Sequence, residues 1–154
     1  MRILVVIVVL MLVLSGGVAR GAMVTGALKL APGMPGDLAN TLVMLYASYD
    51  DWNSFRPLTM VASSGSGSTV VYTINNIPAG VYYLDAWKDN DANGVWSEGD
   101  YLGVYGIFAW PVVTPQPLFV VEGQTTVANV AMYLPGAPVP VQRESWGRIK
   151  AAYR

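Results

Sequence analysis

The chain has 154 residues, of which 53% are hydrophobic and only 12% are charged, and its formal net charge is −1. This length is enough for one ordinary domain with a single core. The sequence contains neither cysteine nor histidine. Disulfide bonds, thiol chemistry, imidazole bases and histidine-ligated zinc are therefore excluded, and Ser-His-Asp and Cys-His mechanisms with them.

The small net charge conceals an uneven distribution. Residues 23–135 carry three basic and nine acidic side chains, whereas the last twelve residues carry four basic side chains and one acidic side chain. An acidic body repels phosphate groups, which argues against a nucleic-acid partner. A divalent cation is the natural counter-charge for these acids.

The N-terminus has the layout of a secretory signal peptide. Arg2 precedes an unbroken apolar run over residues 3–14, and small residues follow it. This run is short for a membrane span, which needs about 20 residues. We therefore expect residues 1–22 to direct export to an extracellular, periplasmic or cell-surface location, and an uncleaved anchor is the alternative. The candidate cleavage positions follow Ala19, Gly21 and Ala22.

After residue 22, β-forming residues dominate and helical periodicity is scarce. Short apolar runs alternate with turns rich in Gly, Pro, Ser and Asn, a spacing that predicts six or seven strands. The expected strands are residues 24–30, 41–49, 57–62, 69–74, 81–88, 118–121 and 125–134. We therefore predict that residues 23–135 form an all-β domain, an antiparallel β-sandwich of about seven strands.

Pleating divides the predicted strand 81–88 into two faces. One face carries an acid, so we expect the opposite face to meet the core. The predicted core face consists of Tyr82, Leu84 and Ala86, and the other face of Tyr83, Asp85 and Trp87.

From residue 136 onward, a Pro-rich linker leads to a basic C-terminal tail. Trp146, Ile149 and Tyr153 follow a spacing that predicts one apolar stripe on a short helix. We expect residues 136–154 to be dispensable for folding and to serve as a tether to an anionic surface or a partner. A disordered end is the alternative.

Three segments resemble parts of the carboxypeptidase-regulatory-like domains, which belong to the prealbumin-like, or starch-binding-like, sandwiches. Residues 24–26 (VTG), 74–84 (INNIPAGVYYL) and 122–126 (EGQTT) look like the first strand, the central turn and strand, and the entry to the last strand. The resemblance covers most of residues 23–134 and implies a prealbumin-like or immunoglobulin-like arrangement of strands. It also implies an accessory module of a secreted protein rather than a catalyst.

The stretch DNDANGVWSEGD, residues 89–100, places four acids within twelve residues. Calcium takes six to eight oxygen ligands, and one loop can supply several of them at alternate positions if a Gly permits a sharp turn. Counted from Asp89, the stretch follows the EF-hand spacing, with Gly94 at the sixth position and an Asp in place of the usual Glu at the twelfth. The predicted ligands are Asp89, Asp91, Asn93, the Val95 carbonyl and Asp100, with Ser97 and Glu98 as further candidates. A solvated turn without metal is the alternative, because Asn-Gly pairs and Asp-rich loops are common in turns.

Aromatic residues cluster around the same stretch. Trp87 precedes it, Trp96 lies within it and Tyr101 follows it. Flat aromatic faces beside a calcium loop are able to stack on sugar rings, so these three residues are candidates for carbohydrate binding. The alternative is that Trp87 and Trp96 pack on one another and cover the edge of the sheet.

Catalysis is not expected. Asp85 and Glu98 are conceivable as a glycosidase pair, but no motif places them across a cleft. The sequence therefore predicts a secreted, non-catalytic interaction module that is stabilised by one calcium ion and binds an extracellular protein or glycan. One alternative is a carbohydrate-binding module that uses the three aromatics. Another is a structural subunit of a surface assembly, in which the tail or the edge strand 125–134 pairs with a neighbour.

Overall fold

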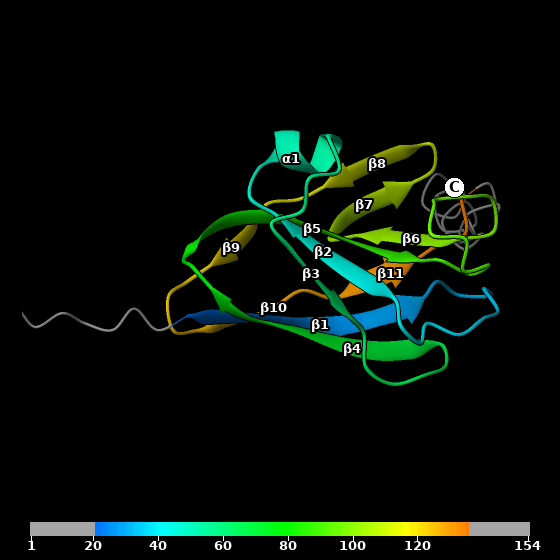
Figure 1. The fold of residues 1–154 in the computed structure, drawn as a ribbon, viewed down its shortest axis with the longest axis horizontal. Coiled ribbons are helices and arrows are strands. Elements are labelled where there is room, and N and C mark those ends of the chain that lie inside the picture. The colour runs from blue at the N-terminus through cyan, green and yellow to red at the C-terminus, as the bar shows by residue number, and fades with distance from the viewer. Residues whose placement is uncertain (1–20, 136–154) are drawn as a thin grey trace, which may run out of the picture.

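The computed structural model describes residues 21–135, which form an all-β fold built around two main sheets (Figure 1). β1 (Ala22–Leu30) lies in the middle of the first sheet. β4 (Thr69–Ile77) pairs with one edge of β1 in the antiparallel direction. β10 (Thr125–Val127) and β11 (Val130–Met132) pair one after the other with its second edge, and both are parallel to it.

The second sheet is antiparallel throughout. β3 (Thr59–Ala62) pairs with β2 (Leu42–Tyr46), and β2 pairs with β5 (Gly80–Lys88). The free edge of β5 is shared by two strands. β6 (Tyr101–Val104) pairs with the last part of β5, and β9 (Leu118–Val120) with the first part.

Two small elements lie outside the main sheets. β7 (Gly106–Ala109) and β8 (Val112–Pro115) form a hairpin between β6 and β9. α1 (Tyr49–Asn53) is a single turn between β2 and β3, and the hydroxyl of Ser48 caps it by accepting the Asp51 N–H at 3.0 Å. Figure 1 shows both elements on the side of the molecule away from β1 and β4. Within residues 21–135, no helix is long and apolar enough to cross a membrane.

The core lies between the two sheets and is formed by alternate residues of their strands. The predicted inward face of β5 is confirmed, because Tyr82, Leu84 and Ala86 all belong to this core. Burying one large aliphatic side chain contributes about 1.5–3 kcal/mol, so this shared apolar layer is the main source of stability. Its largest fully buried side chains are Tyr72, Leu28, Leu38, Leu45, Leu84, Leu118, Met132, Val24 and Val43.

Several predicted strand limits change in the structure. The predicted strand 41–49 ends at Tyr46, because Ser48 starts α1. The predicted strand 125–134 is divided into β10 and β11, two strands of three residues each. β6, β7 and β8 were not predicted. The predicted strand 69–74 is longer, because β4 continues through Ile77.

The predicted domain limit at residue 22 also moves. Ala22 is the first residue of β1, lies opposite Ile77 and is 1% exposed. Cleavage after Ala22 would remove a core residue, whereas cleavage after Ala19 leaves β1 complete. The remaining features predicted for residues 1–20 and 136–154 lie outside the described residues.

The break between β10 and β11 is fixed by a close approach to β1. The Ala128 N–H donates to the Thr25 carbonyl at 2.8 Å, and the Ala128 carbonyl accepts the Tyr72 hydroxyl at 2.6 Å. That carbonyl lies over Gly26, where an added Cβ would come within 2.0 Å of it. Gly26 is therefore required by the space available and not by its backbone freedom.

We expect Gly26→Ala to lower the free energy of unfolding by about 2 kcal/mol or more, because overpacking a rigid backbone contact displaces the chain. Urea denaturation followed by tryptophan fluorescence measures this loss. Val71→Ala is the control, since Val71 is 55% exposed on the neighbouring strand β4. Equal stabilities of the two variants would contradict this account of the β10–β11 break.

Candidate functional site

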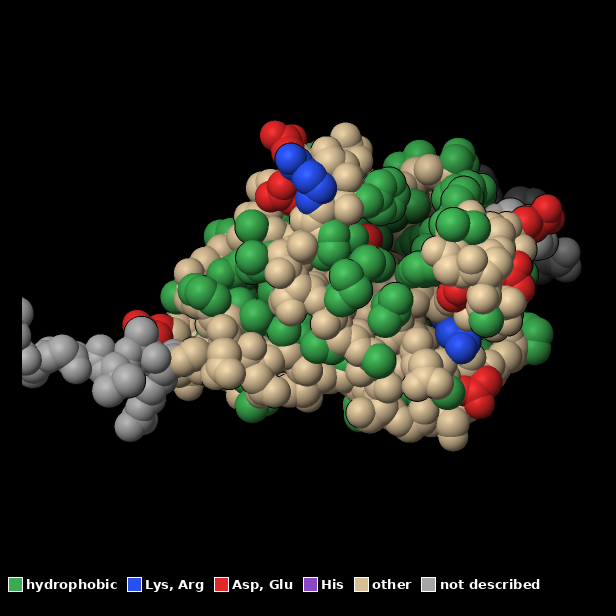
Figure 2. Space-filling model, viewed as in Figure 1, with side chains coloured by type: hydrophobic (Ala, Val, Ile, Leu, Met, Phe, Trp, Pro, Cys, Tyr) green, Lys and Arg blue, Asp and Glu red, His purple; other side chains and the backbone are tan. Residues whose placement is uncertain are grey.

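The acidic loop, residues 89–100, connects β5 to β6 at one end of the sandwich. Its two ends are held together because Lys88 and Tyr101 are paired in the sheet. The backbone turns back through Gly94, whose φ of +77° favours glycine. Figure 2 shows acidic side chains gathered at this end of the molecule. The loop therefore curls back on itself, so that carboxylates from both of its ends come close together.

Three carboxylates meet in this space. One oxygen each of Asp89, Asp91 and Asp100 lies within 4.8 Å of the other two. Ligand oxygens lie 2.3–2.6 Å from a calcium ion, so two oxygens on one ion are at most about 5 Å apart. The three side chains therefore have a separation that a single calcium ion accommodates.

Hydrogen bonds within the loop orient the first two of these acids. Asp89 accepts the backbone N–H groups of Asn93 at 3.2 Å and Gly94 at 2.8 Å. Asp91 accepts the Asn93 backbone N–H at 3.1 Å and its side-chain amide at 2.7 Å. The chain therefore curls around these two side chains, as an Asx-type turn does.

Asp100 anchors the neck of the loop. Its carboxylate accepts N–H groups from Asn90 at 2.9 Å, from Ser97 at 3.0 Å and from the Trp87 indole at 3.1 Å. Burial raises the pKa of Asp100, but these N–H donors outweigh it, so the net change is a lowered pKa. Asp100 is therefore held in its charged form, although its side chain is 1% exposed.

No basic side chain neutralises the three acids within residues 21–135. The ion pair found in this part of the chain joins Arg56 to Asp51 at 3.0 Å, beside α1. Lys88 donates its ammonium group to the Ala39 carbonyl at 2.8 Å. Two like charges 4 Å apart repel by about 1 kcal/mol in bulk water and by about 4 kcal/mol near a protein surface. A cation between the carboxylates would remove this repulsion.

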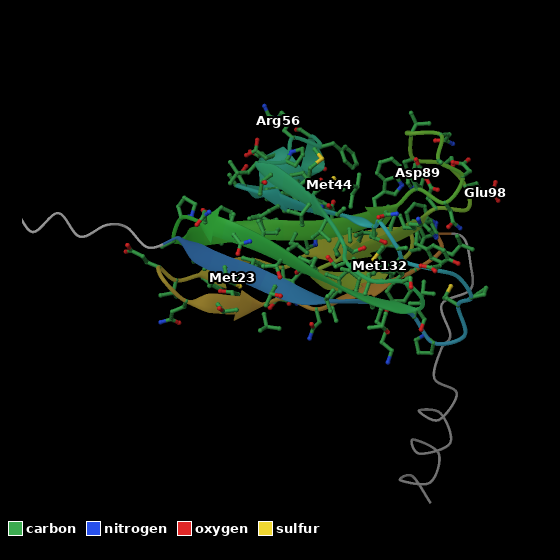
Figure 3. All side chains as sticks on the ribbon, turned by 60° about the horizontal axis from the view of Figure 1, so that its bottom comes forward. Met23, Met44, Arg56, Asp89, Glu98 and Met132 are labelled. Atoms are coloured by element: carbon green, nitrogen blue, oxygen red, sulfur yellow. The ribbon has the colours of Figure 1, made fainter. Side chains whose placement is uncertain are left out.

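The other predicted side-chain ligands do not all face the three carboxylates. The Ser97 hydroxyl lies 3.3 Å from Asp91, next to the cluster. The Asn93 side-chain oxygen accepts the Val95 N–H at 2.8 Å, so its amide group would have to turn to offer oxygen to a metal. Glu98 is exposed and does not belong to the cluster, and Figure 3 shows it apart from Asp89.

The structure removes Tyr101 from the predicted aromatic platform and separates Trp87 from Trp96. Tyr101 is 4% exposed, belongs to the core and donates its hydroxyl to the Pro35 carbonyl, so its ring is not free to stack. Trp87 is half-buried and its indole is committed to Asp100. Trp96 is 53% exposed, but its aromatic neighbour is Trp110 and not Trp87.

The structure instead forms a row of four aromatic rings from three distant segments. The ring centroids of Trp96 and Trp110 are 6.2 Å apart, and those of Trp110 and Phe108 are 6.4 Å apart. Phe108 stacks on Tyr133 at 4.7 Å. Trp110 is 40% exposed, so the row ends in two accessible indoles beside the acidic loop.

Asp85 is a buried acid that the sequence pattern assigned to the solvent-facing side of β5. It lies on that side, but it is only 9% exposed. Its Oδ2 accepts the Trp52 indole N–H of α1 at 3.0 Å and the Tyr46 hydroxyl at 3.3 Å. Burial raises the pKa of Asp85 to about 7, against the lowering effect of these two hydrogen bonds. Asp85 is thus buried on the outer face of β5, whereas Glu98 is exposed in the acidic loop.

Comparison of the chain with models of known families, with curated proteins and with solved structures found no match in any of the three. The resemblance to carboxypeptidase-regulatory-like domains therefore stays a prediction, whereas the all-β fold is observed in the structure.

We expect Asp85 to make the free energy of unfolding fall as pH rises. Its folded-state pKa is raised from 3.8 to about 7, so its stabilising effect is complete below about pH 4 and is lost as pH passes through 7. The loss is at most about 4 kcal/mol. Urea denaturation at pH 4 and pH 9 measures it. Asp85→Asn should flatten the profile, whereas Asp50→Asn, on the exposed side of α1, should leave it unchanged. The same slope in the wild type and in Asp85→Asn would contradict the assignment.

Proposed function

We propose that this protein is an exported, non-catalytic β-sandwich module that holds one calcium ion in its acidic loop and binds an extracellular protein or glycan. The observation that carries the calcium proposal is the meeting of Asp89, Asp91 and Asp100 within 4.8 Å of one another. Carboxylate oxygens are the ligands that calcium prefers.

The ion would join the two ends of the loop. Asp89 follows β5 directly, and Asp100 precedes β6 and is hydrogen-bonded to Trp87 of β5. Between them the loop has almost no core of its own, since Val95 and Trp96 are 63% and 53% exposed. Charge neutralisation by calcium would therefore supply the order that apolar burial does not.

Sequence features support the rest of the proposal. The N-terminal layout favours export. The absence of histidine and cysteine from the sequence removes the commonest nucleophile and base pairs. The resemblance to accessory modules of secreted proteins favours binding over catalysis.

We expect calcium to raise the melting temperature and a chelator to reverse the effect. Because Asp100 is shorter than the usual Glu, we expect a weak extracellular-type site with a Kd of about 10⁻⁴ to 10⁻³ M. At a tenfold excess of calcium over Kd, the stabilisation is about 1.4 kcal/mol. Differential scanning calorimetry and isothermal titration measure the two quantities.

Variants of the same loop separate metal binding from general charge effects. Asp89→Ala and Asp91→Ala should abolish the response to calcium and barely change the metal-free protein. Glu98→Gln removes one charge outside the cluster and should keep the response. The calcium proposal is contradicted if neither calcium nor chelator changes the melting temperature and titration with calcium produces no heat. The loop would then be an acidic turn without a metal.

The aromatic row favours a carbohydrate-binding module as the second candidate function. Two exposed indoles beside a polar loop offer flat apolar faces with hydrogen-bonding groups next to them, which suits the two faces of a sugar ring. The sugar platform would then consist of Trp96 and Trp110, with Phe108 and Tyr133 behind them.

We expect a glycan array to reveal binding that Trp96→Ala and Trp110→Ala each weaken by about fivefold or more, since one stacking contact contributes about 1 kcal/mol or more. Phe55→Ala is the control, because Phe55 is 79% exposed on the segment that follows α1. Binding that survives both tryptophan variants would exclude the row as the platform.

A further inference from the structure

Asp85 is a buried carboxylate for which the described part of the chain supplies no cation. Acidic side chains are almost never buried unless they are paired, because removing a charge from water is costly. The Oδ2 atom of Asp85 has its two donors, but Oδ1 is buried without a hydrogen-bond partner. The nearest arginine by sequence to α1, Arg56, is committed to Asp51. One oxygen of Asp85 therefore lacks a donor, and the whole group lacks a counter-charge.

The surroundings of Asp85 are aromatic and apolar. Met44 of β2 and Val104 of β6 lie directly opposite it in the sheet. Three rings from α1 and β5 gather on the same side. Tyr49 lies 5.5 Å from Trp52 and 5.8 Å from Tyr83 between ring centroids, and the second pair meets edge to face. Figure 2 shows hydrophobic side chains gathered on this face, next to α1.

The unpaired charge of Asp85 and the rings around it determine which kind of ligand would fit. An anion is repelled by Asp85, and a neutral hydroxyl would satisfy Oδ1 without balancing its charge. Calcium and magnesium take six or more ligands, mostly oxygens, whereas a single carboxylate is present on this face of β5. An ammonium group donates a hydrogen bond, carries the missing charge and is attracted to the faces of Trp and Tyr rings.

We propose that Asp85, with the aromatic side chains of α1 and β5, forms a binding site for a primary ammonium group. The group belongs to a free alkylamine or to the lysine side chain of a partner. This site lies on the outer face of the second sheet and is independent of calcium binding by the acidic loop.

α1 is the element that admits the ligand. Oδ1 is covered in the structure, so a neighbouring side chain has to move before an ammonium group reaches it. α1 is a single turn of five residues, none of them buried, and such segments open at low cost. Its Trp52 indole donates a hydrogen bond to Asp85 Oδ2 at 3.0 Å and so lies next to the unpartnered oxygen. Binding is therefore expected to shift Trp52.

Titration of the full-length, ¹⁵N-labelled protein with n-butylammonium at pH 8 tests the site. The indole N–H resonance of Trp52, assigned with Trp52→Phe, should shift and saturate. Tetramethylammonium has the charge without an N–H donor, and n-butanol has a donor without the charge. Both should bind about tenfold more weakly or worse, since a hydrogen bond between charged groups contributes strongly to affinity. A lysine-containing peptide whose N-terminus is acetylated, and whose lysine side chain is free, is compared with butylammonium. Tighter binding of the peptide indicates a protein partner, and tighter binding of butylammonium indicates a free amine.

Variants make the outcome decisive. Asp85→Asn should lose about tenfold or more in affinity for butylammonium. Asp50→Asn, which removes an exposed charge from α1, should keep it. Tyr49→Ala changes a ring that is 46% exposed, so folding should survive while binding weakens. The proposal is overturned if the Trp52 resonance does not saturate, if butanol binds as well as butylammonium, or if Asp85→Asn and Tyr49→Ala both bind like the wild type.

Discussion

The contact between the Ala128 carbonyl and Gly26 is the constraint that sets the path of the last part of the chain along β1. It breaks the last part of the chain into β10 and β11, so that one edge of β1 is covered by two strands in succession. After β11, the chain leaves β1 and reaches the second sheet. Tyr133 and Leu102 exchange backbone hydrogen bonds at 2.8 and 2.9 Å. This link joins the two sheets at β6, the strand that receives the end of the acidic loop.

Two aspartates near this end show how the surroundings decide the charge of one residue type. Asp100 accepts three N–H groups, and they lower its pKa in spite of burial. Asp85 has two donors and one unmatched oxygen, so burial prevails and its pKa rises. The difference lies in the number of donors that point at each carboxylate. Asp100 therefore suits a permanent ligand for a cation, and Asp85 suits a group that gains from an added partner.

Much of the fold was predictable because strand signals are local. The alternation of residues in β1, β4 and β5 and the turns between them identify strands without knowledge of their partners. The sequence also held an unused signal for α1, since Ser48 and Asp51 have the spacing of an N-terminal helix cap. β6, β7 and β8 were missed because Gly106 and Pro111 interrupt the apolar run of residues 101–115. Each of these strands has only four residues, too few for a clear alternation of apolar and polar positions. β6 is completed by pairing with β5, and β7 and β8 pair with each other.

The sequence by itself determined the acidic loop. Asp89, Asp91 and Asp100 lie within twelve residues, and Gly94 and the pairing of β5 with β6 bring them together by local geometry. Only the tertiary structure decided which aromatic rings are free and which acid is buried. Tyr101 turns into the core, Trp96 meets Trp110 of a separate hairpin, and Trp52 donates a hydrogen bond to Asp85 from a turn 33 residues away. Each of these outcomes depends on contacts between distant segments, which no short spacing in the sequence encodes.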